Sequence, residues 1–124
     1  MCLEDFKKQY VNVHICKFID SYKYSSFKKH DNDERGFSCF KVELGTPGDY
    51  TFCASQKNKT DFKNNANYKY SSVRIIAVRL LNGNDIEGGV EWVNGTFEHF
   101  EKDSYLECDN LKKGSYLLFV EWDW

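Results

Sequence analysis

The chain has 124 residues, 41% of them hydrophobic, and its 17 basic and 19 acidic residues are mixed along its length to a net charge of −2. This size suits one domain that folds without a metal or a disulfide, and the mixed charges argue against a dedicated nucleic-acid binder. No apolar run reaches the roughly 18 residues of a membrane span, and the charged, amphipathic residues 1–10 differ from a signal peptide.

The first half of the chain predicts four strands. Apolar and polar residues alternate in the segments 11–15, 22–28, 37–44 and 50–55, which is the pattern of strands with one buried face. An aromatic content of 17% favours strands as well, because aromatic side chains fit a pleated, half-buried surface. The sequence GTPGD at 45–49 predicts a turn, since proline presets one backbone torsion and glycine accepts another. The two strands around this turn predict a β-hairpin.

The second half predicts four more strands. Residues 68–81 form the longest, and its second part is apolar on both faces apart from two arginines, which suits a central strand. The sequence NGND at 82–85 is a strong turn signal. The remaining strands are predicted at 90–93, 104–108 and 116–122. These short strands, with no helical stretch after residue 10, predict one all-β domain over 1–124, an antiparallel eight-stranded β-sandwich.

The cysteines indicate the compartment. Their number is odd and no CxxC pair occurs, whereas a secreted domain usually pairs its thiols in disulfides. We therefore expect a reducing, cytoplasmic location. The five are Cys2, Cys16, Cys39, Cys53 and Cys108.

No arrangement of residues in the sequence predicts catalysis. Cys16 and His14 lie two apart on a predicted strand, where their side chains point in parallel and cannot converge on one substrate. A structural role for this cysteine is the expectation, because a buried free thiol behaves as a small hydrophobe. The sequence holds no phosphate loop, HExxH motif or zinc-ligand spacing. We therefore expect no enzyme activity in this chain and no transition-metal site.

Acidic loop residues predict a calcium site, as an addition to the main interpretation. If the strands alternate up and down, the loops after the second, fourth and sixth emerge at one end of the sandwich. Carboxylate oxygens from two such loops suit calcium, which takes six to eight oxygen ligands. The alternative is an ordinary solvated surface, because lysines crowd the same end. The candidate ligands are Asp31, Asp33, Glu34, Glu98, Glu101 and Asp103.

The tryptophans have two interpretations. Trp92 and Trp122 lie in predicted strands, and core packing is the expectation for both. The alternative is that they anchor a partner, because tryptophan is enriched in interface hot spots. Trp124 is assigned to neither role.

Four stretches of the chain carry a family resemblance. They are DFKKQYVNVHICK at 5–17, GDYTFCASQK at 48–57, YKYSSVR at 68–74 and GSYLLFVEWDW at 114–124. In this order they resemble segments of the C2-like domain, domain III, that follows the protease core in calpains, and the likeness is to protist, ciliate-like members. The match is spread over nearly the whole chain.

The resemblance implies a C2-like sandwich that regulates a calcium-dependent cysteine endopeptidase. Residues 1–10 would then lead in from a preceding protease core, which would be the main partner in the same chain. The protease's own cysteine, histidine and asparagine motifs do not occur in this sequence. The long acidic loop of animal members is reduced here to Asp31, Asp33 and Glu34, which weakens the expectation of an animal-type calcium switch.

Phospholipid is a second partner that the resemblance implies. Each basic side chain near an anionic membrane contributes about 1 kcal/mol to binding. The candidate contacts are Lys28, Lys29, Lys57, Lys59 and Lys63.

Two other functions stay open. The chain could be a free-standing interaction or cytoskeletal adaptor with no protease attached. A carbohydrate-binding sandwich would use exposed aromatic residues such as Tyr22, Tyr24 and Trp92, although the expected reducing compartment argues against it.

Overall fold

The computed structural model describes residues 20–26, 36–61, 67–82 and 85–123. The chain forms two units, Met1–Asp31 and Asn32–Trp124. In the first unit, residues 20–26 are exposed and form a turn followed by irregular backbone. The predicted strand at 22–28 is therefore wrong over its described part, and the predicted strand at 11–15 lies outside the described residues.

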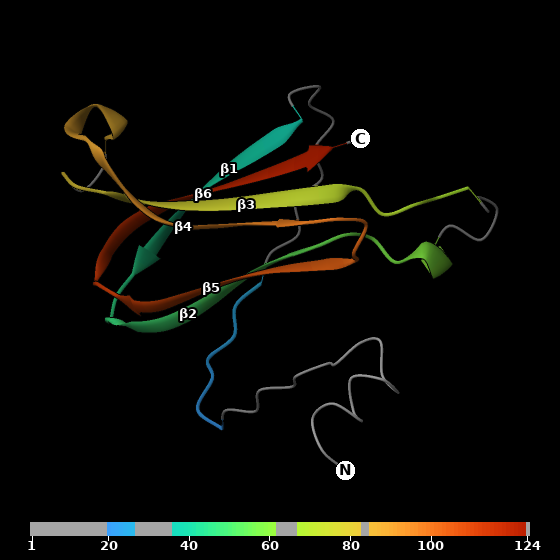
Figure 1. Cartoon of the computed structure of the whole chain (residues 1–124). Helices are drawn as coiled ribbons and strands as arrows, with labels where there is room; N and C mark the ends of the chain where they lie inside the picture. The colour runs from blue at the N-terminus through green and yellow to red at the C-terminus, as the bar shows by residue number, and fades with distance from the viewer. Residues whose placement is uncertain (1–19, 27–35, 62–66, 83–84, 124) are drawn as a thin grey trace, which may run out of the picture. The chain divides into compact units, whose positions relative to one another are not determined.

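The described part of the second unit is all-β, and every strand pair in it is antiparallel (Figure 1). Four strands form one sheet in the order β1-β6-β3-β4, and β2 pairs with β5 in a second sheet. These sheets confirm the prediction of an all-β fold with antiparallel strands, and the arrangement is sandwich-like. The strands are β1 Phe37–Leu44, β2 Gly48–Ser55, β3 Ser72–Leu80, β4 Val90–Glu98, β5 Asp103–Leu111 and β6 Gly114–Asp123, with short 3-10 turns η1 Lys59–Asp61 and η2 Ile86–Gly88.

The core lies between the two sheets. β3 contributes Val73, Ile75 and Ala77, which are almost fully buried, and β5 contributes Leu106 and Cys108 from the other layer. Full burial of a side chain such as isoleucine or leucine stabilises a fold by about 1.5–3 kcal/mol. Because side chains alternate along a strand, this inner row also fixes which residues of β3 face away from the core.

β3 occupies the central position that its two-sided apolar sequence predicts. It pairs with β6 on one side and β4 on the other. It is shorter than predicted, because Tyr68 and Tyr70 precede the strand and lie in irregular backbone. These two rings contact each other edge to face at 5.9 Å between centroids, an arrangement that stabilises them outside the sheet.

The predicted hairpin around residues 45–49 is wrong. β1 pairs with β6 and β2 pairs with β5, so the turn carries the chain from one layer to the other. Both strands have one apolar row, and crossing layers lets these rows face each other across the core instead of lying side by side. The turn itself is present, closed by a 2.7 Å hydrogen bond that the Tyr50 hydroxyl donates to the Thr46 carbonyl.

Candidate interaction surfaces

Gln56, directly after β2, joins three segments of the chain. Its side-chain amide donates to the carbonyls of Ser71 (2.7 Å) and Glu101 (3.0 Å), and its side-chain oxygen accepts from the Ser71 N–H (3.0 Å). Its own backbone N–H donates to the Lys102 carbonyl. The side chain is buried with both its donors and its acceptor satisfied. The sequence resemblance marks Gln56 and Ser71 in separate stretches, and the structure brings them together.

This junction gathers two loops at one end of the sandwich, as the alternation of strands predicts. We call residues 56–61, 67–71 and 98–103 the clamped loop end. Its most exposed aromatic residue is Phe100, which is 67% exposed at the tip of the β4–β5 loop. The backbone of Phe100 has φ 55°, a left-handed conformation that costs an ordinary L-residue about 1–2 kcal/mol. The ring of Phe100 is therefore a surface feature of this loop and not part of the core.

His99 supports this exposed tip. Its ring lies between Phe97, at 4.5 Å between centroids, and Phe100, at 6.0 Å. Its Nδ1 shares a 3.3 Å hydrogen bond with the Ser72 hydroxyl at the start of β3. Phe97 in turn lies under the Arg74 guanidinium at 5.4 Å. The tip is therefore tied by its aromatic rings to β3.

The lysines of the clamped loop end contact its tyrosines. The Lys59 ammonium lies 4.4 Å from the centre of the Tyr70 ring, and the Tyr68 hydroxyl donates to the Lys57 carbonyl at 3.3 Å. Lys57 and Lys59 are both exposed. The other predicted lipid contacts, Lys28, Lys29 and Lys63, lie outside the described residues, so the lipid surface stays a prediction.

The predicted calcium ligands also divide into a set that the structure describes and a set that it does not. Glu98 and Glu101 are exposed at the clamped loop end, whereas Asp103 accepts a hydrogen bond from the Ser55 hydroxyl. Over the described ranges, no three acidic, histidine or cysteine side chains form a group able to hold a metal ion. Asp31, Asp33 and Glu34 lie outside those ranges. A calcium site built on both sets therefore stays a prediction.

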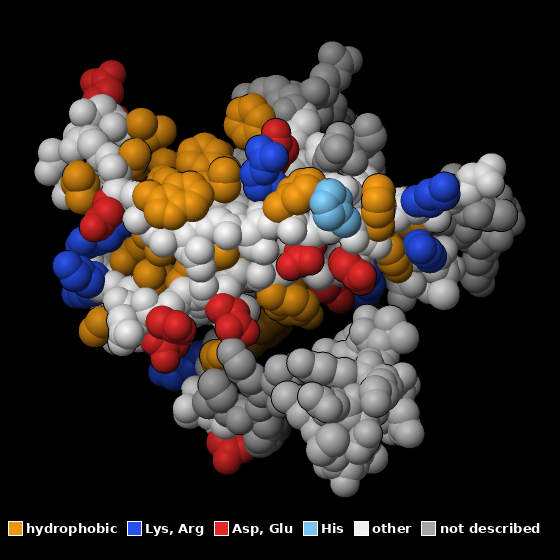
Figure 2. Space-filling view, in the orientation of Figure 1, with side chains coloured by type: hydrophobic (Ala, Val, Ile, Leu, Met, Phe, Trp, Pro, Cys, Tyr) orange, Lys and Arg blue, Asp and Glu red, His pale blue; other side chains and the backbone are white. Residues whose placement is uncertain are grey.

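A second surface covers the side of the four-stranded sheet that faces away from the core. We call it the outer face of the large sheet. On β3 it presents Ile76, Val78 and the buried Leu80, between Arg74 and the end of the strand. Figure 2 shows hydrophobic side chains gathered over β3 and β4. The register adds Phe37, Leu117, Phe119, Val90, Trp92 and Phe97 from the neighbouring strands.

Trp92 dominates this face. It is 63% exposed, so the expectation of core packing is wrong for Trp92, while Trp122 is half-buried against the core as predicted. A Cβ at Gly95 would lie 2.9 Å from the Trp92 ring, so this glycine lets the indole lie against the strand. The residues beside the ring on β3 and β4 are apolar, Val78 and Val90 among them.

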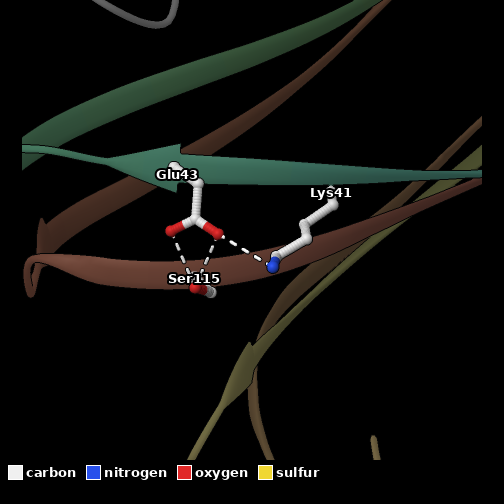
Figure 3. Close-up of polar contacts among 3 residues, drawn as sticks. All are labelled: Lys41, Glu43 and Ser115. Atoms are coloured by element: carbon white, nitrogen blue, oxygen red, sulfur yellow. Dashed lines mark hydrogen bonds and ion pairs between the residues drawn. The ribbon is translucent and has the colours of Figure 1, made fainter. Parts of the chain in front are cut away.

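Charged residues flank the apolar part of this face in ion pairs. Arg74 contacts Glu121 at 2.9 Å, and Lys41 contacts Glu43 at 3.1 Å. The Ser115 hydroxyl donates to the Glu43 carboxylate at 2.7 Å, and the three residues join β1 to β6 (Figure 3). This hydrogen bond is the main cause that lowers the pKa of Glu43, and Lys41 lowers it further. The charges on the face therefore balance.

A small hollow and three cysteines bear on small-molecule and thiol chemistry. A hollow of about 150 Å³ lies among Ser72, Arg74, Phe97, Glu121 and Trp122, smaller than the roughly 300 Å³ at which ligand pockets begin. Burial raises the pKa of the Cys39, Cys53 and Cys108 thiols, which works against the thiolate that a nucleophile requires. Cys16 and His14 lie outside the described residues.

Comparison of the chain with protein-family models, with curated proteins and with solved structures found no match. Among the described residues, no helix has the length and apolar character needed to cross a membrane. The two surfaces and the sequence resemblance are the features of this chain that bear on its function.

Proposed function

We propose that this chain is a non-catalytic, C2-like regulatory domain of a calpain-like cysteine endopeptidase that acts in the cytoplasm. The observation that carries the proposal is the Gln56 junction. Gln56 and Ser71 stand in two of the four stretches that resemble the family, and they exchange hydrogen bonds across 15 residues of sequence. Two stretches that resemble the family and also contact each other in the structure support a shared fold better than two unconnected stretches do.

The clamped loop end is the proposed contact with the protease core. Loops that carry exposed aromatic residues on a rigid scaffold are common binding elements. Phe100 is such a residue. The side chain of Gln56 holds the loop that carries Phe100 in place, through its hydrogen bond to the Glu101 carbonyl. Calcium or anionic phospholipid would act at the same end through its described carboxylates and lysines, Glu98, Glu101, Lys57 and Lys59.

A binding titration tests this function. The full chain is titrated calorimetrically into a calpain-type protease core, with and without calcium. We expect saturable binding, which Phe100→Gly weakens by about tenfold or more, since exposed aromatic anchors contribute above 1 kcal/mol. Phe100→Gly also relieves the left-handed strain, so the variant should be at least as stable as the wild type. Trp92→Ala, on the other surface, is the control and should bind normally.

Loss of binding without loss of stability in Phe100→Gly would support the proposal. Absence of binding by the wild-type chain under both conditions would contradict it and leave the alternative of a free-standing adaptor, which the exposed outer face also favours. Two double variants distinguish calcium binding from lipid binding. One combines Asp31→Asn with Asp33→Asn, and the other combines Lys57→Glu with Lys59→Glu. The first should abolish calcium heat, and the second should weaken binding to anionic vesicles.

A further inference from the structure

The outer face of the large sheet departs from the usual pattern of antiparallel sheets. Such sheets usually bury one face and present polar side chains on the other. Here β3 and β6 are apolar on both faces, and the outer row includes Leu80 and Leu117, which are buried, beside Trp92, Val90 and Phe97, which are exposed. A contiguous exposed apolar surface of this kind marks an interaction site.

The charges on this face indicate what covers it. Its described charged side chains are Arg74 with Glu121 and Lys41 with Glu43, two cations and two carboxylates. An acidic or basic partner would find no net charge of opposite sign. A copy of the same face, turned by a two-fold rotation, can present a carboxylate to each cation and a cation to each carboxylate.

We propose that a second copy of this chain covers the outer face, so that the large sheets of two protomers pack face to face around a two-fold axis. Sheets stack in this way at about 10 Å, with interdigitated side chains. Trp92 is the anchor, because it is the most exposed large side chain on that face. The resulting interface is apolar, as homodimer interfaces are. It uses a different surface from the proposed protease contact, so either can hold without the other.

Sedimentation of the full chain over about 1–200 µM tests the proposal, a range that spans weak to moderate dimer affinities. We expect the mass to rise from 14.6 kDa to twice that value. Trp92→Glu should raise the dimer dissociation constant by at least about 30-fold, the scale of a lost hot spot. Tyr105→Glu makes the same change at a 56% exposed position on β5 and should leave the constant unchanged.

Two further variants keep the test decisive. Val90→Lys places a charge in the same face if Trp92→Glu fails to fold, which circular dichroism will reveal. Arg74→Glu alone should weaken the dimer, and Arg74→Glu combined with Glu121→Arg should restore it. A wild-type chain that stays monomeric throughout, or a dimer indifferent to both Trp92→Glu and Val90→Lys, would overturn the proposal. Binding of a monomeric wild type to the protease core through Trp92 would overturn it as well, in favour of a different occupant.

Discussion

The two sheets of this molecule have contrasting outer faces. In the small sheet, β5 alternates from Ser104 to Cys108, with Ser104, Leu106 and Cys108 buried and Tyr105 and Glu107 exposed. In the large sheet, β3 and β6 have apolar side chains on both faces. In β5 the apolar face packs on the core and the other face is exposed to water. In β3 both faces are apolar, so the face away from the core requires a second cover. Strand patterning thus separates a solvent face from a contact face.

The largest expected effect compares the two faces of β3 at neighbouring positions. Ile75 is almost fully buried in the core, and Ile76 is half-buried on the outer face. Ile75→Ala should lower the free energy of unfolding by about 3–4 kcal/mol, because it leaves a cavity. Ile76→Ala should cost about 1 kcal/mol, since less surface is lost from a packed site. Urea denaturation of both variants at low protein concentration measures the difference, and equal losses would contradict the distinction between the faces.

Gln56→Ala should have the next largest effect. The change leaves the buried carbonyl and N–H of Ser71 and the Glu101 carbonyl without their partner. We expect a loss of about 2–3 kcal/mol, the cost of unpaired buried groups. Thr60→Ala, an exposed change in the same loop, is the control and should stay within about 0.5 kcal/mol of the wild type. A loss no larger than that of the control would show that the junction does not hold the loop end.

Two buried serines allow a smaller comparison. Among the described residues, the Ser104 hydroxyl is completely buried without a hydrogen-bond partner, whereas the Ser72 hydroxyl bonds His99. Ser104→Ala should leave stability unchanged or raise it by up to about 1 kcal/mol, because it removes an unsatisfied polar group. Ser72→Ala should lower it by about 0.5–1 kcal/mol. Thermal melts should therefore give a lower melting temperature for Ser72→Ala and an equal or higher one for Ser104→Ala, and a destabilised Ser104→Ala would contradict the assignment.

The smallest effect concerns Glu43. Ser115→Ala removes the main cause of its lowered pKa, so the pKa should rise toward the ordinary range in a carboxyl NMR titration. A lowered folded-state pKa stabilises the protein above the unfolded-state pKa, and this contribution is lost as pH falls through the folded value. The variant should therefore lose less stability than the wild type over that acid interval. An unchanged Glu43 titration would contradict the role of the hydroxyl.

Sequence patterns locate the six described strands but predict their partners poorly, and they also predict a strand at 22–28 whose described part is not a strand. β1 begins and ends at the predicted residues because its alternation is regular. The hairpin prediction failed because a GTPGD turn can reverse the chain within one sheet or between two layers. Which of the two occurs depends on the other available partners, here β6 for β1 and β5 for β2. Trp92 was misplaced because alternation identifies a face without telling what covers it. The Gln56 junction depends on segments far apart in sequence, and its only signal was the family resemblance.

Hydrogen–deuterium exchange of the full chain at low and high protein concentration tests most directly whether the outer face of the large sheet is a contact surface. We expect protection of β3 and β4 to rise with concentration, while β2 and β5 exchange at the same rates throughout. Exchange that is independent of concentration in both sheets, or protection gained by the small sheet instead, would contradict it.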